Sequence, residues 1–126
     1  MEKTSCVDDT ALSLEPYFKI REGKVADFKA YFGNKVLTIY ENRGAEKTIN
    51  YGFSYNGNFM HCRESYRDAA GFLKHMENVG AYIDYVLKHF ADVHKISCHG
   101  PKEEVDKCRE ALKPLGTKFY NLEWGY

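Results

Sequence analysis

The residues in this sequence that could act as metal ligands, nucleophiles or acid–base groups include five histidines and four cysteines. Both types bind zinc, and a local zinc site needs two of them at a short fixed spacing such as CxxC or HxxxH. The sequence contains neither spacing. His61 and Cys62 are adjacent, so on a strand they face opposite ways and cannot hold one ion together. We therefore expect no metal, while a site assembled from distant segments stays open.

Nucleophilic and phosphate-binding motifs are also missing from the sequence. A nucleophilic role for Cys62 would need a partner histidine and a helix N-terminus to lower the thiol pKa. A small buried apolar side chain is the alternative for this residue. The chain lacks GxGxxG, P-loop and GxSxG motifs. The four cysteines, Cys6, Cys62, Cys98 and Cys108, form no CxxC pair, and we expect reduced thiols in a cytoplasmic protein.

Size and charge restrict the class of protein. The 126 residues are enough for one domain that folds without disulfides or metal. Eighteen basic and eighteen acidic residues give a net charge of zero, whereas a nucleic-acid binder or a polybasic membrane ligand would show a basic excess. The N-terminus has no signal-peptide pattern, and there is no run of about 18 apolar residues. We expect a cytoplasmic localisation and no nucleic-acid or membrane partner.

The elements that must position any site begin at Leu12. Residues 1–11 are polar and aperiodic, which predicts a loose arm, and residues 12–126 are the predicted domain. Apolar residues alternate over 12–20, which indicates a strand in which Pro16 marks an edge or a bulge. They then recur every three or four residues over 25–39, which indicates a helix with one buried stripe.

The remaining elements follow from similar patterns. Strands 48–55 and 59–66 flank Asn56-Gly57, a hairpin signal in which both turn residues adopt positive φ. Asp68 is the predicted N-cap of a helical region over 69–90, with a break at Asn78 and Gly80. A strand over 93–99, a helix with Pro101 in its first turn, and a strand over 118–124 complete the chain.

This order of elements predicts a ferredoxin-like α+β fold, an antiparallel sheet with helices on one face, followed by an extra helix and strand. Ten Tyr, eight Phe and one Trp make up 15 % of the chain, more than one small core needs. On the predicted strands these rings fall on both sheet faces. We therefore expect a homodimer in which the helix-free faces of two sheets pack symmetrically.

The stretch ESYRDAAGFLKH, residues 64–75, resembles the third-strand-to-helix motif of the antibiotic biosynthesis monooxygenase (ABM) family. The motif has an acidic or aromatic strand end, a charged turn, a small-small-x-Phe helix start and then a histidine. Residues 75–80 and 93–101 also resemble bacterial proteins grouped with this family. The resemblance implies a dimeric α+β barrel, with a pocket in each subunit between its own sheet and its first two helices.

The resemblance also implies a function. Family members with known activity oxidise polycyclic phenols or quinols with O₂ and use no metal or flavin, since an electron-rich phenolate or enolate can itself reduce O₂. The protein supplies an apolar aromatic cavity, orienting hydrogen bonds and a base. We expect a cofactor-independent, monooxygenase-like enzyme that binds a small apolar or aromatic ligand, such as a quinol. The alternative is a non-catalytic ligand-binding or stress-associated dimer.

His75 matches the helix histidine of the family and is the predicted catalytic residue, because its ordinary pKa suits it to remove or share a phenolic proton. A rim position or a ligand contact without chemistry is the alternative. A neighbouring branch of the superfamily degrades haem with an Asn on the first strand and a Trp and a His on the second helix. Residues 11–21 contain no Asn, and His75 and Tyr85 occupy the other two positions. Haem degradation is therefore not expected, although His89 lies one turn later.

Five aromatic or flexible side chains are the predicted substrate contacts. Tyr66 and Phe72 match the aromatic positions of the motif, and Met76 follows them one turn later on the same helix. Phe32, on the first predicted helix, and Trp124 complete the set. Core packing is the alternative for Tyr66 and Phe72, and for Trp124 the alternative is packing at the dimer edge.

Overall fold

A computed structural model describes residues 10–36, 38 and 47–123. The described strands form one five-stranded sheet covered by helices. The strands are β1 (Leu12–Ile20), β2 (Thr48–Asn56), β3 (Phe59–Tyr66), β4 (Ala91–Gly100) and β5 (Lys118–Asn121). The helices are α1 (Val25–Tyr31), its π-helical continuation η1 (Phe32–Val36), α3 (Ala69–His89), α4 (Lys102–Leu112) and the short 3-10 helix η2 (Lys113–Leu115).

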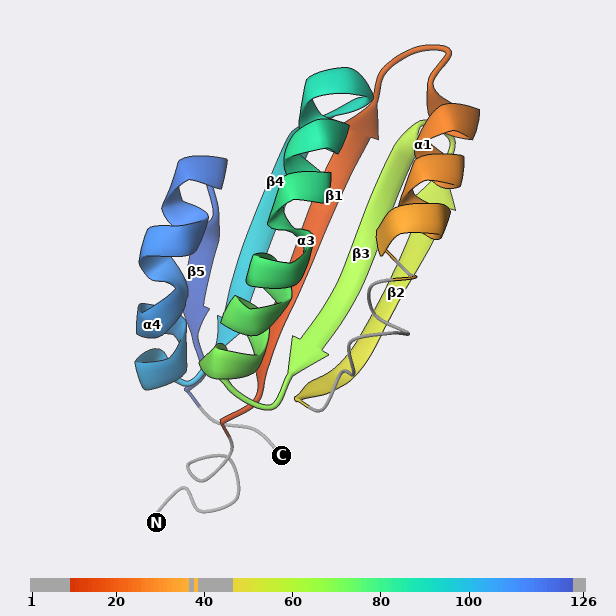
Figure 1. Ribbon diagram of the computed structural model, residues 1–126. Coiled ribbons are helices and arrows are strands. Elements are labelled where there is room, and N and C mark those ends of the chain that lie inside the picture. The colour runs from red at the N-terminus through yellow and green to blue at the C-terminus, as the bar shows by residue number, and fades with distance from the viewer. Residues whose placement is uncertain (1–9, 37, 39–46, 124–126) are drawn as a thin grey trace.

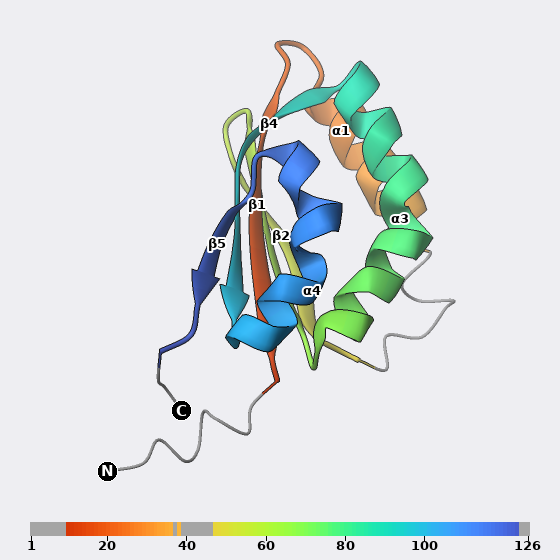
Figure 2. The same cartoon turned by 90° about the vertical axis from the view of Figure 1, so that its left-hand side faces the viewer.

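The strand order is β2-β3-β1-β4-β5, and the helices α1, α3 and α4 lie on the same face of the sheet (Figures 1 and 2). This arrangement confirms the predicted ferredoxin-like α+β fold. The sheet is not wholly antiparallel, because β5 pairs with β4 in parallel. A strand–helix–strand connection through α4 brings the chain back in the same direction, as parallel neighbours require.

Strand β1 lies at the centre of the sheet, so Pro16 does not mark an edge. Pairing with β3 runs from Leu12 to Leu14 and resumes at Tyr17, on the far side of Pro16. Against β4, the register shifts between Tyr17 and Phe18. A proline has no N–H to give to the ladder, and the pairing with β3 is interrupted at this position. Tyr17 pairs with Lys95 and Phe18 with Val93, so the extra residue at the shift is His94. An irregularity therefore lies near Pro16, but its extra residue is in the neighbouring strand β4.

The predicted hairpin between β2 and β3 forms, but its turn is displaced by one residue. Asn56 pairs with Phe59, so the two turn residues are Gly57 and Asn58. Gly57 has a φ of +59°, and no non-glycine residue in the described part of the chain has a positive φ. The turn therefore needs one left-handed residue at its first position, not two in succession.

Helix α3 runs without interruption from Ala69 to His89, so the predicted break at Asn78 and Gly80 is wrong. The Asp68 carboxylate accepts a hydrogen bond from the Gly71 N–H at 2.9 Å, as the predicted N-cap requires. Buried residues continue along the helix through Val79 to Val86. Their burial against the sheet outweighs the cost of about 1 kcal/mol for one glycine in a helix.

Smaller differences concern helix and strand ends. Residues 25–31 are α-helical and residues 32–36 form a π-helix, where one α-helix over 25–39 was predicted. Pro101 occupies the N-cap position of α4, one residue before the helix, and not its first turn. Strand β5 ends at Asn121, three residues before its predicted end.

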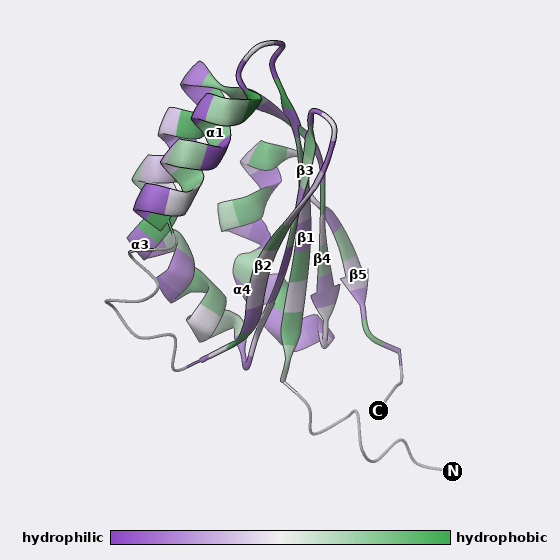
Figure 3. Ribbon diagram, turned by 90° about the vertical axis from the view of Figure 1, so that its right-hand side faces the viewer, coloured by the Kyte–Doolittle hydropathy of each residue, from purple (hydrophilic) through white to green (hydrophobic). Residues whose placement is uncertain are grey.

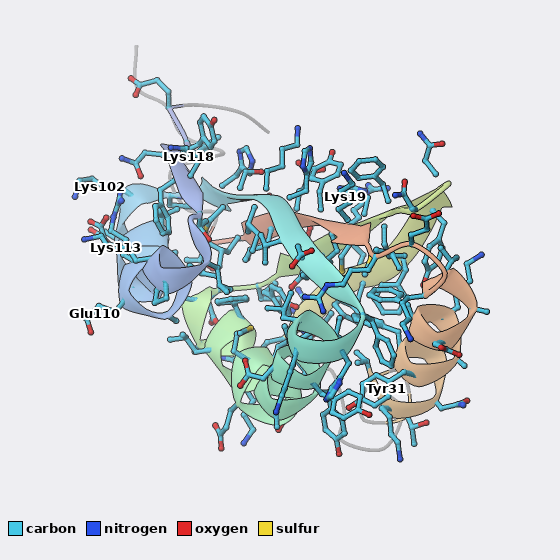
Figure 4. All side chains as sticks on the ribbon, turned by 90° about the horizontal axis from the view of Figure 1, so that it is seen from above. Lys19, Tyr31, Lys102, Glu110, Lys113 and Lys118 are labelled. Carbon is cyan, nitrogen blue, oxygen red and sulfur yellow. The ribbon has the colours of Figure 1, made fainter. Side chains whose placement is uncertain are left out.

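The two sheet faces differ in composition. On the inner face of β1 every second residue from Leu12 to Ile20 is buried, and the core fills the space between sheet and helices. Figure 3 shows that each helix carries both apolar and polar residues, as a helix that covers one sheet face does. Figure 4 shows side chains on both sides of the sheet, with Lys19 on the helix-free side. Rings on that helix-free side belong to Tyr17, Phe59, His61, His94, His99 and Tyr120.

Candidate functional site

A cavity of about 40 Å³ lies between the inner face of the sheet and α3. Strands β1, β2, β3 and β4 contribute its floor, while α3, η1 and the α4–η2 segment contribute its walls. Its surface is almost entirely apolar. The lining residues are Leu14, Pro16, Phe18, Phe32, Tyr51, Cys62, Glu64, Phe72, His75, Met76, Ile83, Ile96, Leu112 and Leu115.

Glu64 brings a carboxyl group into this apolar space. It occupies an inward-facing position of β3, two residues from Cys62 and two from Tyr66, so the pleat places all three side chains on the same face. Glu64 is 5 % exposed. Its Oε1 accepts a hydrogen bond from the Tyr66 hydroxyl at 2.7 Å, and its Oε2 accepts one from the Cys62 thiol at 3.1 Å. Each carboxyl oxygen is thereby fixed by a donor from its own strand.

Burial governs the protonation of this carboxyl group. It raises the pKa of Glu64 from 4.5 to about 6, and the hydrogen bonds from Tyr66 and Cys62 offset part of that rise. Near neutral pH Glu64 is therefore ionised yet more basic than an ordinary carboxylate. A base with a pKa just below the working pH has the protonation state and the driving force that general-base catalysis needs.

His75 faces Glu64 from α3. The imidazole is 6 % exposed, and its Nε2 lies 3.7 Å from the Glu64 Oε1. Its ring contacts those of Tyr51 and Tyr66, with centroids 4.9 and 5.5 Å away. Burial lowers the pKa of His75 from 6.5 to about 4, so the ring is neutral near pH 7. Of the pair, Glu64 is the stronger base, and His75 can act as a neutral N–H donor.

The environment of Cys62 keeps its thiol protonated. Burial, together with the neighbouring Glu64 carboxylate, raises the pKa of this thiol well above its ordinary value. A nucleophilic cysteine needs the opposite shift, toward a thiolate. Cys62 therefore serves as a hydrogen-bond donor to Glu64.

The structure places four of the six predicted site residues in the cavity wall: Phe32, Phe72, His75 and Met76. Tyr66 lies next to the wall, where it donates to Glu64 and packs against the rings of Phe72 and His75. Trp124 lies outside the described residues. The roles assigned to these six residues remain predictions.

Sequence reasoning missed Glu64, Cys62 and Tyr51 as site residues, although the motif begins at Glu64 itself. The signal was present in the strand pattern. A charged residue at the centre of the alternation Cys62, Glu64, Tyr66 must face the core if its two neighbours do. A charge there is buried only when it is hydrogen-bonded, and such a group is a candidate for chemistry.

Other kinds of site find little support in the described ranges. Over residues 10–36, 38 and 47–123, no three His, Cys, Asp or Glu side chains come together as metal ligands. Tyr85 and His89, considered for haem, are exposed on α3 and do not line the cavity. No helix among the described residues is long and apolar enough to span a membrane.

The fold is that of the ABM-like proteins. A candidate antibiotic biosynthesis monooxygenase from Nitrosomonas europaea superposes with a TM-score of 0.61 at 13 % identity, over 75 % of this chain and 92 % of that one. SnoaB, a cofactor-independent oxygenase from Streptomyces nogalater, gives 0.57 at 11 % identity, over 71 % and 90 %. These matches confirm the ABM-like resemblance at the level of the fold.

A closer similarity extends to the sequence. MupZ from Pseudomonas fluorescens is 35 % identical, with a TM-score of 0.81 over 94 % of this chain and 89 % of that one. The chain therefore belongs to the MupZ family, within the ABM-like fold. No protein-family model and no curated protein matches it.

Proposed function

We propose that the protein is a cofactor-independent, monooxygenase-like enzyme that oxidises a small aromatic or quinol substrate in this cavity. The observation that carries the proposal is the pair formed by Glu64 and His75, two ionisable side chains buried 3.7 Å apart in an apolar cavity. Buried ionisable groups with shifted pKa values are concentrated at functional sites.

The chemistry needs one base and one donor. The Glu64 carboxylate removes a proton from a phenol, or from a carbon made acidic by an adjacent ring carbonyl. His75 donates an N–H to the substrate oxygen on which negative charge develops. The resulting anion is electron-rich and gives its electrons to O₂. For a substrate CH₂ group, one oxygen atom becomes the product carbonyl, and the other leaves as water with the two hydrogens.

The size of the cavity favours a small substrate. An apolar cavity of about 150 Å³ binds benzene, whereas this cavity measures about 40 Å³. Met76 and Ile83 on α3 and Leu115 in η2 line it and are only half-buried. A single ring can enter when these side chains move, and methionine is the most adaptable of the three.

Oxygen uptake tests the proposal. We expect the wild-type protein to consume O₂ with substituted hydroquinones, which have a single ring, and to react less with the larger naphthoquinols and anthrones. Glu64→Gln should lower kcat at least ~100-fold, as loss of a general base does. His75→Ala should also lower the rate. Glu104→Gln is the matched control, because Glu104 is a buried carboxylate, 7 % exposed, that does not line the cavity. Absence of uptake with every compound would overturn the proposal. Ligand-induced increases in Tm without turnover would favour the non-catalytic binding protein.

We also propose that the protein is a homodimer that pairs through its helix-free sheet faces. Tyr17 lies near the middle of this face, with its ring 4.4 Å from the His61 ring and the Lys95 ammonium 4.6 Å above it. Glu15 lies 3.3 Å from the His61 Nε2. Rings and charges of both signs on one surface suit contact with a symmetric copy. A sedimentation mass near 14.6 kDa, that of one chain, at micromolar concentration would overturn this proposal.

A further inference from the structure

The cavity holds the parts of a proton-transfer site that needs no oxidant. Glu64 and His75 are shifted in opposite directions by the same burial, so an ionised carboxylate and a neutral imidazole face each other near pH 7. The shifts reverse the order of the two pKa values, so the carboxylate becomes the stronger base and the imidazole is left to act as a donor. This pairing suits the removal of a proton from carbon next to a carbonyl group.

The hydrogen bonds that hold Glu64 in place leave its carboxylate able to accept a proton. Tyr66 donates to Oε1 and Cys62 to Oε2. Since a carboxylate offers about four lone-pair positions, these two hydrogen bonds leave each oxygen a second position for a proton. Both donors lie on β3 with Glu64, so the base is supported by a strand of the sheet and not by a loop. A base fixed in this way loses little entropy when it meets a substrate.

The walls fix the kind of substrate. Leu14, Phe18, Phe72 and Ile96 are apolar and buried around the Glu64–His75 pair. Among the described residues, no Lys or Arg side chain lines the cavity. An anionic substrate would therefore lack a counter-ion here. A neutral ketone fits, because its carbon skeleton meets the apolar wall and its oxygen meets the imidazole.

We propose that this cavity catalyses an oxygen-independent isomerisation of small neutral β,γ-unsaturated ketones, in which Glu64 transfers the proton and His75 donates to the enolate oxygen. The Glu64 carboxylate takes a proton from the α-carbon. The electron pair of the broken C–H bond forms the C=C bond of a dienolate, and negative charge moves to the oxygen near His75. Glu64 then returns the same proton to the γ-carbon. The product is the conjugated ketone, so atoms and electrons balance without O₂.

The isomerase activity uses the same cavity as the proposed oxygenase but does not depend on the oxygenase reaction. Proton removal is common to both reactions, and they differ in what happens to the anion. In the oxygenase the anion reduces O₂, whereas in the isomerase it recovers its proton. In an apolar cavity that holds little water, the protonated Glu64 carboxyl has few proton acceptors other than the substrate carbon. Return of the proton to carbon is therefore favoured.

The test uses cyclohex-3-enone under strict exclusion of O₂. Its conversion to cyclohex-2-enone is followed by the absorbance of the conjugated product. Mass spectrometry in D₂O measures how often the transferred proton exchanges with solvent, and return of the same proton predicts little deuterium at the γ-carbon. Both the wild type and Met76→Ala are assayed, because the second has a larger cavity. We expect isomerisation by at least one of them and a loss of at least ~100-fold in kcat when Glu64→Gln is added. Glu104→Gln should keep the parent rate.

The role of His75 has its own comparison. His75→Gln keeps an N–H donor, whereas His75→Leu removes it, so the Gln variant should retain more of kcat than the Leu variant. Equal rates in these two variants would overturn the donor role. If folded wild-type and Met76→Ala proteins show no isomerisation, the isomerase proposal is wrong. Oxygen uptake with quinols in that case would leave the proposed oxygenase function intact. Isomerisation without oxygen uptake would support the isomerase and contradict the oxygenase.

Discussion

Glu64 links the stability of the fold to pH in a direction opposite to most carboxylates. Because its folded pKa is raised from 4.5 to about 6, its contribution favours folding below pH 4.5 and is lost as the pH rises through 6. A difference of 1.5 pKa units corresponds to about 2 kcal/mol. The free energy of unfolding of Glu64→Gln minus that of the wild type should therefore rise by about 2 kcal/mol between pH 4.5 and 7.5. Urea unfolding across this range measures it, and a constant difference would contradict it.

His75 has the opposite effect on the pH dependence of stability. Its folded pKa is lowered from 6.5 to about 4, so its contribution to stability is complete above pH 6.5 and is lost as the pH falls through 4. The difference of 2.5 units corresponds to about 3 kcal/mol. Relative to the wild type, His75→Gln should therefore gain about 3 kcal/mol between pH 7 and 4. The same urea titrations measure this gain. If His75→Gln instead parallels the wild type down to pH 4, the imidazole is not buried as described.

The sequence predicted the helix side of the site better than its strand side. His75, Phe72 and Met76 lie on one helix at a spacing of three or four residues, so a motif that fixes one of them also places the others. Glu64 was harder to assign, because a charged residue near a strand end is usually exposed. Its burial depends on donors two residues away on both sides, and that compensation is visible only once the inward face of β3 is known.

At the scale of elements, Gly71 and Gly80 make a matched pair within α3. A Cβ on Gly71 would lie 2.7 Å from the Lys47 Cβ and 3.2 Å from the Lys47 carbonyl oxygen, which already accepts from the Arg67 N–H. A Cβ on Gly80 would meet nothing within 4 Å. Gly71→Ala should therefore destabilise the fold by about 1–3 kcal/mol through overpacking, while Gly80→Ala should stabilise it by up to about 1 kcal/mol.

Thermal and urea unfolding of the two variants provide the measurement. Each serves as the control for the other, because both replace glycine by alanine in the same helix and differ in what surrounds the new methyl group. Equal effects would show that Gly71 does not hold α3 close to the segment before β2. The comparison also tests whether the first turn of α3 needs a residue as small as glycine at position 71.

Local sequence patterns predicted the helices and strands, whereas contacts and connections between them determined the continuity of α3 and the direction of β5. The bounds of β1 follow from its alternation, which is regular because alternate residues face the core. Gly80 suggested a break in α3 that burial of Val79 and Val86 overrides. The parallel pairing of β5 with β4 is a property of the connection through α4, and no residue within β5 encodes it.

At the scale of the whole molecule, none of the described helices covers Tyr17 and its neighbouring rings on the outer sheet face, which is the basis of the proposed dimer. Tyr17→Glu places a charge near the centre of that face, where a symmetric contact would bring two such charges together. We expect this variant to sediment near 14.6 kDa and the wild type near twice that mass. Tyr85→Glu is the matched control, because Tyr85 is an exposed ring on the outer side of α3, 4.6 Å from that of Tyr31. If Tyr17→Glu stays dimeric while Tyr85→Glu becomes monomeric, the subunits pair through the helices, and the helix-free face is open to solvent.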